Sequence, residues 1–488
     1  MGLLAIATFS ACVSVSEQEK IALSTYSSGV SVHDPSIVTA RSGEYYIFGS
    51  HMAVAKSSDL WEWESVFDGV SVRNPLFDDL LSDPVAFDYV GRNSDGGYSI
   101  WAPDVMYNDV MGKYVMYFSI TSTYVKSNIA FATADSIEGP YSYQGRLIYS
   151  GFTQENLEQT NVLDHVDRAH TTRYASTTTY HNYRWPNAID PALFYDANGR
   201  LWMVYGSWSG GIFLLELDQE TGVPIRPEPS GDRHVDPYFG IHLLGGNHSS
   251  IEGPYIVYDE EVEFYYLFVS YGRLTSEGGY QVRVFRSRDP QGPYTDARGR
   301  ELDPVYPHAE FGAKLMGNYI LPSLSRAYMA PGHGSALIRD DGTRLFVFHV
   351  RFDDGAEYHE PRVHQWFVNS DGWPVMAPFA YQGERLQEGG FTTDQVVGDY
   401  QLVGFGTDIS ARIAQPVRVT LSRDGSAEVD GGPGGVWTMK EESPEMTIEL
   451  DDRIYSGFFL FQADEAGTGV MTFTALSGSN DAVWGMRY

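Results

Sequence analysis

The stretch Asn187-Ala-Ile-Asp-Pro-Ala-Leu-Phe-Tyr-Asp-Ala-Asn-Gly-Arg-Leu-Trp-Met-Val-Tyr-Gly-Ser207 combines an acid, a short apolar run, a polar turn and a second apolar run. The turn, Asp196-Ala-Asn-Gly199, is typical of a β-hairpin. The unit recurs along the chain, and the acid in front of it recurs as well. This repetition predicts a radial array of β-sheets whose first strands carry carboxylates to a common centre.

Five such units can be aligned, each with three apolar runs and irregular spacing between units. The first runs are 35–39, 103–107, 191–195, 254–258 and 335–338; the second are 45–50, 114–119, 201–207, 264–270 and 345–350; the third are 53–55, 129–133, 212–217, 282–285 and 364–368. The pattern predicts an all-β chain with a five-bladed β-propeller. A β-sandwich with many hairpins is the alternative. It would not explain why similar residues, which we call the heads, precede the first run of each unit.

The repeat divides the chain into three parts. Residues 1–20 form a leader and linker, 21–383 the propeller, and 384–488 a glycine-rich region of short strands that predicts a small β-sandwich or barrel. Long irregular segments at 65–98, 150–185 and 221–248 separate the runs. Loops of this length in a compact domain are usually functional, so we expect them to form the walls of a cleft.

Composition excludes several classes of partner. With 33 basic and 64 acidic residues the net charge is −31, whereas nucleic acids and anionic membranes require a basic surface. Tyrosine and tryptophan are abundant and suit sugar rings, although most should belong to the core. No apolar run reaches the roughly 18 residues of a membrane-spanning helix.

The first twelve residues resemble the apolar end of a secretory signal. Phe9-Ser-Ala-Cys12 is similar to a bacterial lipoprotein cleavage box, and Cys12, the single cysteine, excludes an intramolecular disulfide. We therefore expect a secreted protein or an outer-surface or periplasmic lipoprotein. The lipid anchor on Cys12 and simple secretion remain alternatives.

Three units begin with an acid: Asp34, Asp190 and Glu252. A fourth, Trp101-Ala-Pro-Asp104, has its acid one place inside the strand, and the fifth has His333. Because first strands line the axis of a propeller, these side chains should converge. Converging carboxylates repel one another, so at least one pKa should be raised. A proton donor and an ionised acceptor across one pocket are what glycosidic hydrolysis needs.

The sequence Ser-Ile-Glu-Gly-Pro-Tyr occurs twice, around Glu138 and Glu252. Glu138 follows the third run of its unit, where the equivalent position of another unit has Gln291. Glu252 instead precedes a first run. We therefore assign the chemistry to Glu252 and a structural turn to Glu138.

These heads resemble the family 43 glycoside hydrolases, five-bladed propellers that hydrolyse arabinose- and xylose-containing polysaccharides with inversion. The resemblance implies that Asp34 is the general base, that Glu252 is the general acid, and that Asp190 modulates the pKa of that acid. An inverting site leaves room for water between base and acid, about 6.5–9.5 Å apart.

Within the family, the chain is most similar to two-domain endo-α-1,5-L-arabinanases, which cleave the arabinan side chains of pectin. The motifs that carry this likeness are His33-Asp-Pro-Ser-Ile37, Trp101-Ala-Pro-Asp-Val105, Asn187-Ala-Ile-Asp-Pro191, Gly206-Ser-Trp-Ser209 and Pro331-Gly-His-Gly-Ser335. The resemblance implies a calcium ion at His333, held largely through waters. An imidazole is an unusual calcium ligand, so the residues alone do not predict this metal, and a histidine that satisfies its own turn is the alternative.

The same motifs suggest substrate contacts. Trp101 would stack against sugar, unless it is a core tryptophan, and Asn187, Ser207, Trp208 and Ser209 flank the pocket. An exo-acting arabinofuranosidase or β-xylosidase on the same fold is the nearest rival. A non-catalytic carbohydrate-binding propeller is a rival of another class, against which the three acids argue. The metal-capable run 164–170, with His181, has no standard ligand spacing and is interpreted as a surface loop.

Overall fold

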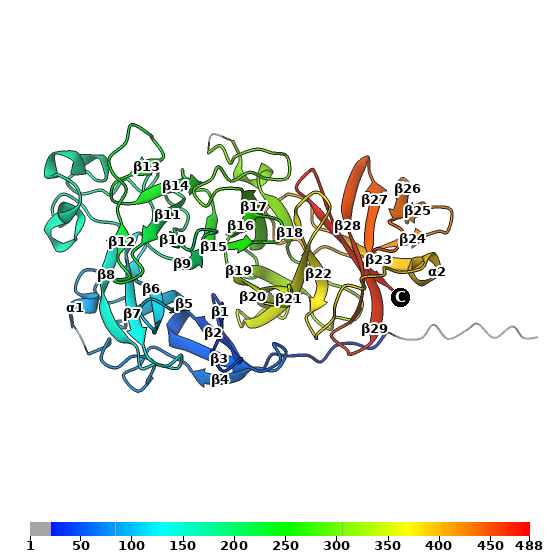
Figure 1. Ribbon diagram of the computed structural model, residues 1–488, viewed down its shortest axis with the longest axis horizontal. Coiled ribbons are helices and arrows are strands. Elements are labelled where there is room, and N and C mark those ends of the chain that lie inside the picture. The colour runs from blue at the N-terminus through cyan, green and yellow to red at the C-terminus, as the bar shows by residue number, and fades with distance from the viewer. Residues whose placement is uncertain (1–20, 83, 305) are drawn as a thin grey trace, which may run out of the picture.

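The computed structural model describes residues 21–82, 84–304 and 306–488, so the predicted leader and Cys12 lie outside the described part of the chain. Five β-sheets follow one another, and a closed eight-stranded barrel follows them. In Figure 1 the sheets surround a common centre, with β1, β5, β9, β15 and β19 innermost, and the barrel lies to one side. The predicted five-bladed propeller with a small C-terminal β-domain is confirmed, and that domain is a barrel.

The first three blades are antiparallel sheets that run outward from the axis. Their strands are β1 Ser36–Thr39, β2 Tyr45–Gly49, β3 Ala53–Ser57 and β4 Glu64–Phe67; β5 Ser99–Asn108, β6 Lys113–Thr123, β7 Lys126–Ala134 and β8 Ser142–Tyr149; and β9 Ala192–Tyr195, β10 Leu201–Tyr205, β11 Ile212–Leu217, β12 Pro224–Ile225, β13 Val235–Asp236 and β14 Gly240–Leu244.

Blades 4 and 5 and the barrel complete the chain. Their strands are β15 Ile251–Asp259, β16 Phe264–Tyr271, β17 Gln281–Ser287 and β18 Ala313–Met316; β19 Tyr328–Ile338, β20 Arg344–Phe352, β21 Glu360–Val368 and β22 Pro374–Ala380; and β23 Gly398–Gly404, β24 Val417–Leu421, β25 Ser426–Val429, β26 Gly435–Met439, β27 Glu445–Leu450, β28 Arg453–Ala463, β29 Gly469–Ser477 and β30 Ala482–Arg487.

Helices are short. They are α1 Pro84–Phe87, α2 Thr393–Val396 and the 3-10 turns η1 Ser50–Met52, η2 Leu157–Gln159, η3 Val162–Asp164, η4 Arg168–Arg173 and η5 His308–Glu310. In the part of the chain that the structure describes, no helix has the length and apolar character needed to cross a bilayer.

The outermost strand of each blade was not predicted. Residues of β4 are exposed or only partly buried, so the strand has no apolar run to mark it. The outer strand of blade 5, β22, is fully buried but contains two prolines, which are rare inside strands. A neighbouring element explains this burial, because β22 packs against β28, β29 and β30 of the barrel.

One hydrophobic core joins the barrel to blades 4 and 5. It includes Phe348 and Trp366 of blade 5 together with Leu460 and Trp484 of the barrel. The Trp484 ring is fully buried and lies 5.0 Å from the ring of Tyr319. The propeller and the barrel therefore bury apolar surface against each other.

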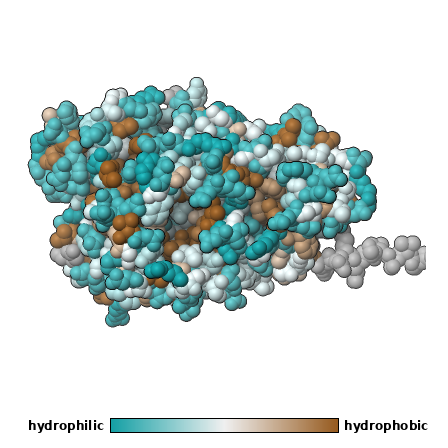
Figure 2. All heavy atoms as spheres, in the orientation of Figure 1, coloured by the Kyte–Doolittle hydropathy of each residue, from teal (hydrophilic) through white to brown (hydrophobic). Residues whose placement is uncertain are grey.

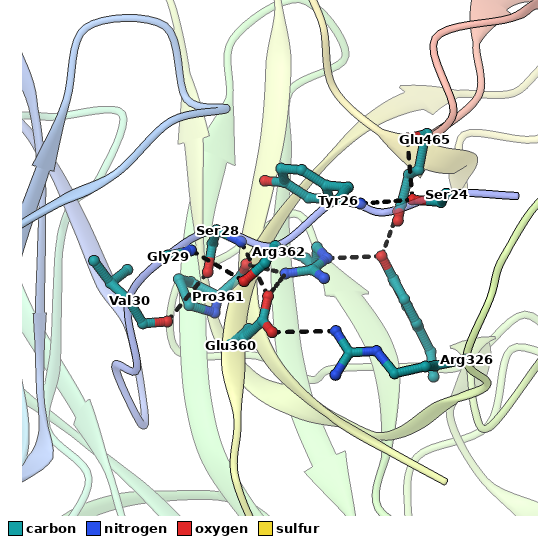
Figure 3. A network of polar contacts seen from close by, with 12 residues as sticks. Ser24, Tyr26, Ser28, Gly29, Val30, Arg326, Glu360, Pro361, Arg362 and Glu465 are labelled. Atoms are coloured by element: carbon teal, nitrogen blue, oxygen red, sulfur yellow. Dashed lines mark hydrogen bonds and ion pairs between the residues drawn. The ribbon is translucent and has the colours of Figure 1, made fainter. Parts of the chain in front are cut away.

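A buried polar network, drawn in Figure 3, adds the N-terminal segment to this junction. Arg362 donates to Glu360 Oε2 at 3.0 Å and, through Nε, to the hydroxyl of Tyr328 at 2.7 Å. That hydroxyl donates to Glu465 of the barrel. The backbone N–H of Ser28 donates to the same oxygen of Glu360 at 3.0 Å. Arg362 thus lies between three parts of the molecule.

Candidate active site

One backbone position recurs at the inner end of every blade. Its φ is positive in all five cases, which is uncommon for residues other than glycine: +56° at Asp34, +43° at Ala102, +57° at Asp190, +57° at Gly253 and +41° at His333. In β5, β15 and β19 this position lies at a bulge inside the strand. The five head residues are therefore equivalent, and Glu252 stands one residue before the shared position.

Hydrogen bonds between neighbouring blades hold four of these heads. In each, the backbone N–H of the head donates to a side chain that lies in the second strand of the preceding blade or directly after it. The pairs are Ala102 to Ser50 Oγ (2.9 Å), Asp190 to Ser119 Oγ (3.0 Å), His333 to Ser270 Oγ (2.7 Å) and Asp34 to His349 Nδ1 (3.3 Å). His349 closes the ring between blades 5 and 1. The heads are thus fixed by contacts across blades.

Blade 3 departs from this pattern, and the departure positions an acid. Gly206 occupies the place of the serine, and a Cβ there would collide with the carbonyl oxygen of Gly211. The N–H of Gly253 donates instead to Asp190 Oδ2, at 3.3 Å. The Asp190 carboxylate therefore lies against the backbone of the residue that follows Glu252.

Asp34 is surrounded by hydrogen-bond donors. Ser50 Oγ donates to its Oδ2 at 2.5 Å, where His33 Nδ1 also lies at 2.7 Å, and His333 Nδ1 lies 3.0 Å from Oδ1. Burial by itself would raise the pKa of this carboxyl, but the two histidines outweigh it and hold the pKa well below its usual range. Asp34 is therefore ionised.

The pKa values of Asp190 and Glu252 are shifted in the opposite direction, upwards. Burial raises the pKa of Asp190 to about 7, with His333 opposing and the other two carboxylates adding to the shift. Burial also raises the pKa of Glu252, against the opposing effect of His333, and Ser207 Oγ donates to its Oε2 at 3.1 Å. The pair therefore retains a proton at a pH where Asp34 has none.

His333 faces all three acids. Burial would lower the pKa of its imidazole, but Asp34, Asp190 and Glu252 together raise it to about 9. A positive charge between the carboxylates lets them approach one another despite their mutual repulsion.

Two adjoining cavities form a cleft over these residues. The catalytic cavity, about 320 Å³, is lined by Asp34, Asp190, Glu252 and His333. The acid-side cavity, about 550 Å³, contacts Glu252 but neither aspartate. Both are lined by Trp101, Ile189, Glu252 and Leu274, so they join beside the acid. In Figure 2 the surface is hollowed near the centre of the propeller, and hydrophobic residues gather at the hollow.

Comparison with known proteins agrees with this geometry. The family profile "Glycosyl hydrolases family 43" matches residues 28–165 and 170–374. The chain belongs to glycosyl hydrolase family 43. A second profile, "C-terminal lipocalin-like domain", matches residues 378–485 and covers the barrel. The resemblance to two-domain members of family 43 is confirmed.

Several family 43 relatives are arabinan-degrading enzymes by name. "Extracellular endo-alpha-(1->5)-L-arabinanase 2" of Bacillus subtilis is 39% identical over 94% of this chain and 93% of its own length. The crystal structure of an endo-1,5-alpha-L-arabinanase from Thermotoga petrophila has a TM-score of 0.83 at 36% identity, covering 96% of this chain and all of that one. An "Extracellular exo-alpha-(1->5)-L-arabinofuranosidase" of Cellvibrio japonicus is 24% identical over 71% of this chain and 86% of its own length.

The predicted substrate-contacting residues divide into two groups. Trp101 is 38% exposed and lines both cavities, while Asn187, Ser207 and Trp208 line the acid-side cavity. Ser209 is fully buried, and its hydroxyl lies 3.0 Å from that of Tyr124, behind the cleft wall.

Sequence reasoning missed other lining residues. Tyr124 lies in the short turn between β6 and β7, and Leu274 in the loop between β16 and β17. Neither turn contains a motif. Ser276, two residues after Leu274, donates to Glu357 Oε1 at 2.8 Å, which connects this loop to the one that follows β20. Such a tie becomes visible only when distant loops are brought together.

The expectation for the cleft walls was wrong. Residues 65–98, 150–185 and 221–248 line neither of the two cavities, whose walls come from shorter turns near the axis. Parts of the second and third segments line a separate cavity on blade 3. Segment 221–248 also contains β12, β13 and β14, whose short length hid them in the sequence.

Glu138 lies away from the cleft, in the turn after β7. Its Oε1 accepts a hydrogen bond from the Tyr46 hydroxyl at 2.8 Å. The metal-capable run also lies elsewhere, in the exposed turns around η3 and η4, where His181 Nδ1 contacts the Arg173 carbonyl oxygen at 3.0 Å. Neither feature contributes to the cleft.

The described residues include one group that could hold a metal: His33, Asp34 and His349, whose ligand atoms lie within 4.8 Å of one another. Two imidazoles and one carboxylate suit zinc or a similar transition metal better than calcium, which prefers oxygen ligands. His333 is not a member of this group.

Proposed function

We propose that this family 43 enzyme hydrolyses α-1,5-linked L-arabinofuranosyl bonds within arabinan, with inversion of configuration. Asp34 acts as general base, Glu252 as general acid, and Asp190 as modulator of that acid. The observation that carries the proposal is the opposite direction of the pKa shifts of Asp34 and Glu252 in one cavity. Two carboxyls with separated pKa values are the requirement for acid–base cleavage of a glycosidic bond.

The reaction follows from these protonation states. Ionised Asp34 takes a proton from a water molecule while the oxygen of that water attacks the anomeric carbon. Protonated Glu252 donates its proton to the leaving glycosidic oxygen. Attack and departure occur on opposite faces of the sugar, so its configuration inverts. Asp190 is held against Gly253, and its like-charge repulsion with Glu252, which adds to the raised pKa of Asp190, disfavours ionisation of both carboxyls together. Ser207 orients the Glu252 carboxyl.

Both the shape of the cleft and the names of the relatives support arabinan as the substrate. Because the acid-side cavity contacts Glu252 and not Asp34, we assign it to the leaving-group side of the chain. Trp101 would stack on a sugar ring. Asn187 and Ser207 would form hydrogen bonds with the hydroxyls of the sugar. Space on both sides of the acid favours internal cleavage. The relatives named endo-arabinanases point to arabinan.

Calcium at His333 stays a prediction of the family resemblance, with waters supplying most ligands. No catalytic step above depends on it. Dialysis against a chelator followed by restoration with calcium would support it, and restoration by zinc alone would favour the His33, Asp34 and His349 group instead. We also propose export from the cell, as the names of the relatives suggest.

A product profile on linear debranched arabinan tests the proposed function. We expect mixed arabino-oligosaccharides early in the reaction and slow turnover of aryl arabinofuranoside and aryl xyloside. Release of arabinose alone would favour the exo-acting arabinofuranosidase, preference for the xyloside would favour a β-xylosidase, and binding without cleavage would favour a carbohydrate-binding propeller.

A further inference from the structure

A third cavity, which we call the blade 3 pocket, lies beside the cleft and has no part in the proposed reaction. Its volume is about 380 Å³, within the range of small-ligand sites. Arg184, Arg233, His234 and His242 line it together with Tyr183. Basic residues thus gather in one cavity of a chain whose net charge is −31.

The two arginines supply its positive charge. Arg184 lies over the ring of Trp185, with its guanidinium carbon 5.0 Å from the ring centroid, and Arg233 Nε donates to His234 Nε2 at 3.0 Å. Neither guanidinium forms an ion pair with an acid in the described part of the chain. Burial lowers the pKa of His242 to about 4, so this imidazole is neutral. Two exposed guanidinium groups therefore remain available to a ligand.

One acid, Asp236, is among the described residues that line the pocket, but other contacts occupy its carboxylate. The Tyr174 hydroxyl donates to it at 2.9 Å, and the N–H groups of Tyr238 and Phe239 donate at 2.9 and 2.8 Å. Arg173 Nε lies 3.8 Å away. Asp236 is buried, these donors hold its carboxylate, and in the described part of the chain it forms no ion pair with Arg184 or Arg233.

Exposed aromatic rings connect the pocket with the cleft. Tyr124 lines the acid-side cavity and is 56% exposed; Tyr183 lines the blade 3 pocket and is 64% exposed. His248 contacts both, because its Nδ1 lies 2.8 Å from the Tyr124 hydroxyl and its ring packs edge-on against Tyr183 at 4.3 Å. A sugar chain that leaves the cleft on the acid side can follow these rings, whose faces suit sugar.

We propose that the blade 3 pocket binds the carboxylate of a hexuronic acid unit, carried by the same polysaccharide whose neutral arabinan part occupies the cleft. That arabinan, the neutral part of the polysaccharide, occupies the cleft rests on the proposed function. Arginine is the side chain best matched to a planar carboxylate, which it binds with two parallel hydrogen bonds. A uronic acid combines that carboxylate with a sugar ring for Tyr183. The substrate is then a mixed neutral and acidic polymer.

Calorimetric titration of the whole chain with a galacturonic acid tetramer tests this proposal. We expect saturable binding that weakens as salt is added, because exposed charge pairs are screened. The double variant Arg184→Ala/Arg233→Ala should bind at least about tenfold more weakly, the loss expected for one charge-assisted hydrogen bond. Arg168→Ala is the matched control: it removes one positive charge from the same long segment, where Arg168 pairs with Glu158, and should bind the tetramer normally.

Absence of binding, or equal binding by the double variant, would overturn the proposal. Inorganic phosphate that competes as strongly as the tetramer would show a general anion site and overturn the assignment to a sugar acid. Melting temperatures verify the fold, and the single charge reversals Arg184→Glu and Arg233→Glu replace the double variant if it folds poorly. The readout is heat of binding, so a chain that binds the tetramer but leaves arabinan intact contradicts the proposed function alone.

Discussion

Glu252 and Glu138 share the local sequence Ser-Ile-Glu-Gly-Pro-Tyr but have different surroundings. Glu252 lines the catalytic cavity, whereas Glu138 pairs with Tyr46 in an outer turn. We expect Glu252→Gln to lower kcat on arabinan by about 10²–10⁴-fold, the usual contribution of a general acid. Glu138→Gln is the matched control and should change kcat less than about twofold, because Glu138 lines neither cavity and glutamine keeps an oxygen that can accept the hydrogen bond of Tyr46. Initial rates and circular dichroism of both variants decide this, and an inactive Glu138→Gln would refute the assignment.

The pKa shifts predict an asymmetric pH profile. The base works ionised, so activity falls on the acid side only when pH drops through the depressed pKa of Asp34, below the ordinary aspartate value. The acid works protonated, so activity falls as pH rises through the raised pKa values of the coupled Asp190–Glu252 pair, near the value of about 7 for Asp190. Measurement of kcat/KM from about pH 4 to about pH 9 should therefore show the alkaline limb and no acid limb. An acid limb close to neutrality would contradict the account of Asp34.

At the scale of elements, side chains in or directly after the second strand of one blade position the heads of the next blade. Ser119→Ala removes the acceptor of the Asp190 N–H and leaves a buried donor unpaired, which costs about 1–3 kcal/mol. Because the proposed role of Asp190 is to modulate the pKa of Glu252, we also expect the alkaline limb of the pH profile to move.

Ser127→Ala separates the two effects. Ser127 is fully buried in the same blade and donates to Thr121 Oγ1, a hydrogen bond that involves none of the heads. This variant should lower the melting temperature without moving the alkaline limb. Identical pH profiles for the two serine variants would show that Ser119 has only a structural role.

The sequence predicted the inner strands because their residues are apolar and follow turns that it marks clearly. It could not predict the ring of contacts between blades, since the acceptor and donor of each bond lie 52 to 315 residues apart. Ser50 and Ser119 are visible at the ends of second runs, but nothing nearby shows their partners. Ser209 failed for a related reason: its motif is local, whereas its burial depends on Tyr124 from another blade.

At the scale of the whole molecule, one hydrophobic core continues from blades 4 and 5 of the propeller into the barrel. The predicted boundary at 383/384 falls between β22 and β23, in a linker that this core spans. We expect a single cooperative unfolding transition for both domains.

Substitution of Arg362 tests how much the junction between the propeller and the barrel contributes to the free energy of unfolding. Arg362→Met would remove the fully buried one of the two guanidinium partners of Glu360 and leave Arg326 at 3.2 Å from Oε1; loss of one member of a buried pair costs up to about 3–5 kcal/mol. Arg418→Ala, which breaks an exposed pair with Asp399 on the barrel, is the control and should cost at most about 1 kcal/mol. Denaturant unfolding of both variants gives the comparison. Equal stabilities would show that the network in Figure 3 contributes little.

The most direct test of the central claim is the anomeric configuration of the first product. Proton NMR of linear arabinan during the first minutes of hydrolysis, before mutarotation, distinguishes the two stereochemical outcomes. If Asp34 activates water while Glu252 protonates the leaving oxygen, the new reducing ends appear first in the β-configuration, inverted from the α-linkage. New reducing ends that appear first as α would mean retention through a covalent intermediate, and would contradict the proposed roles of both residues.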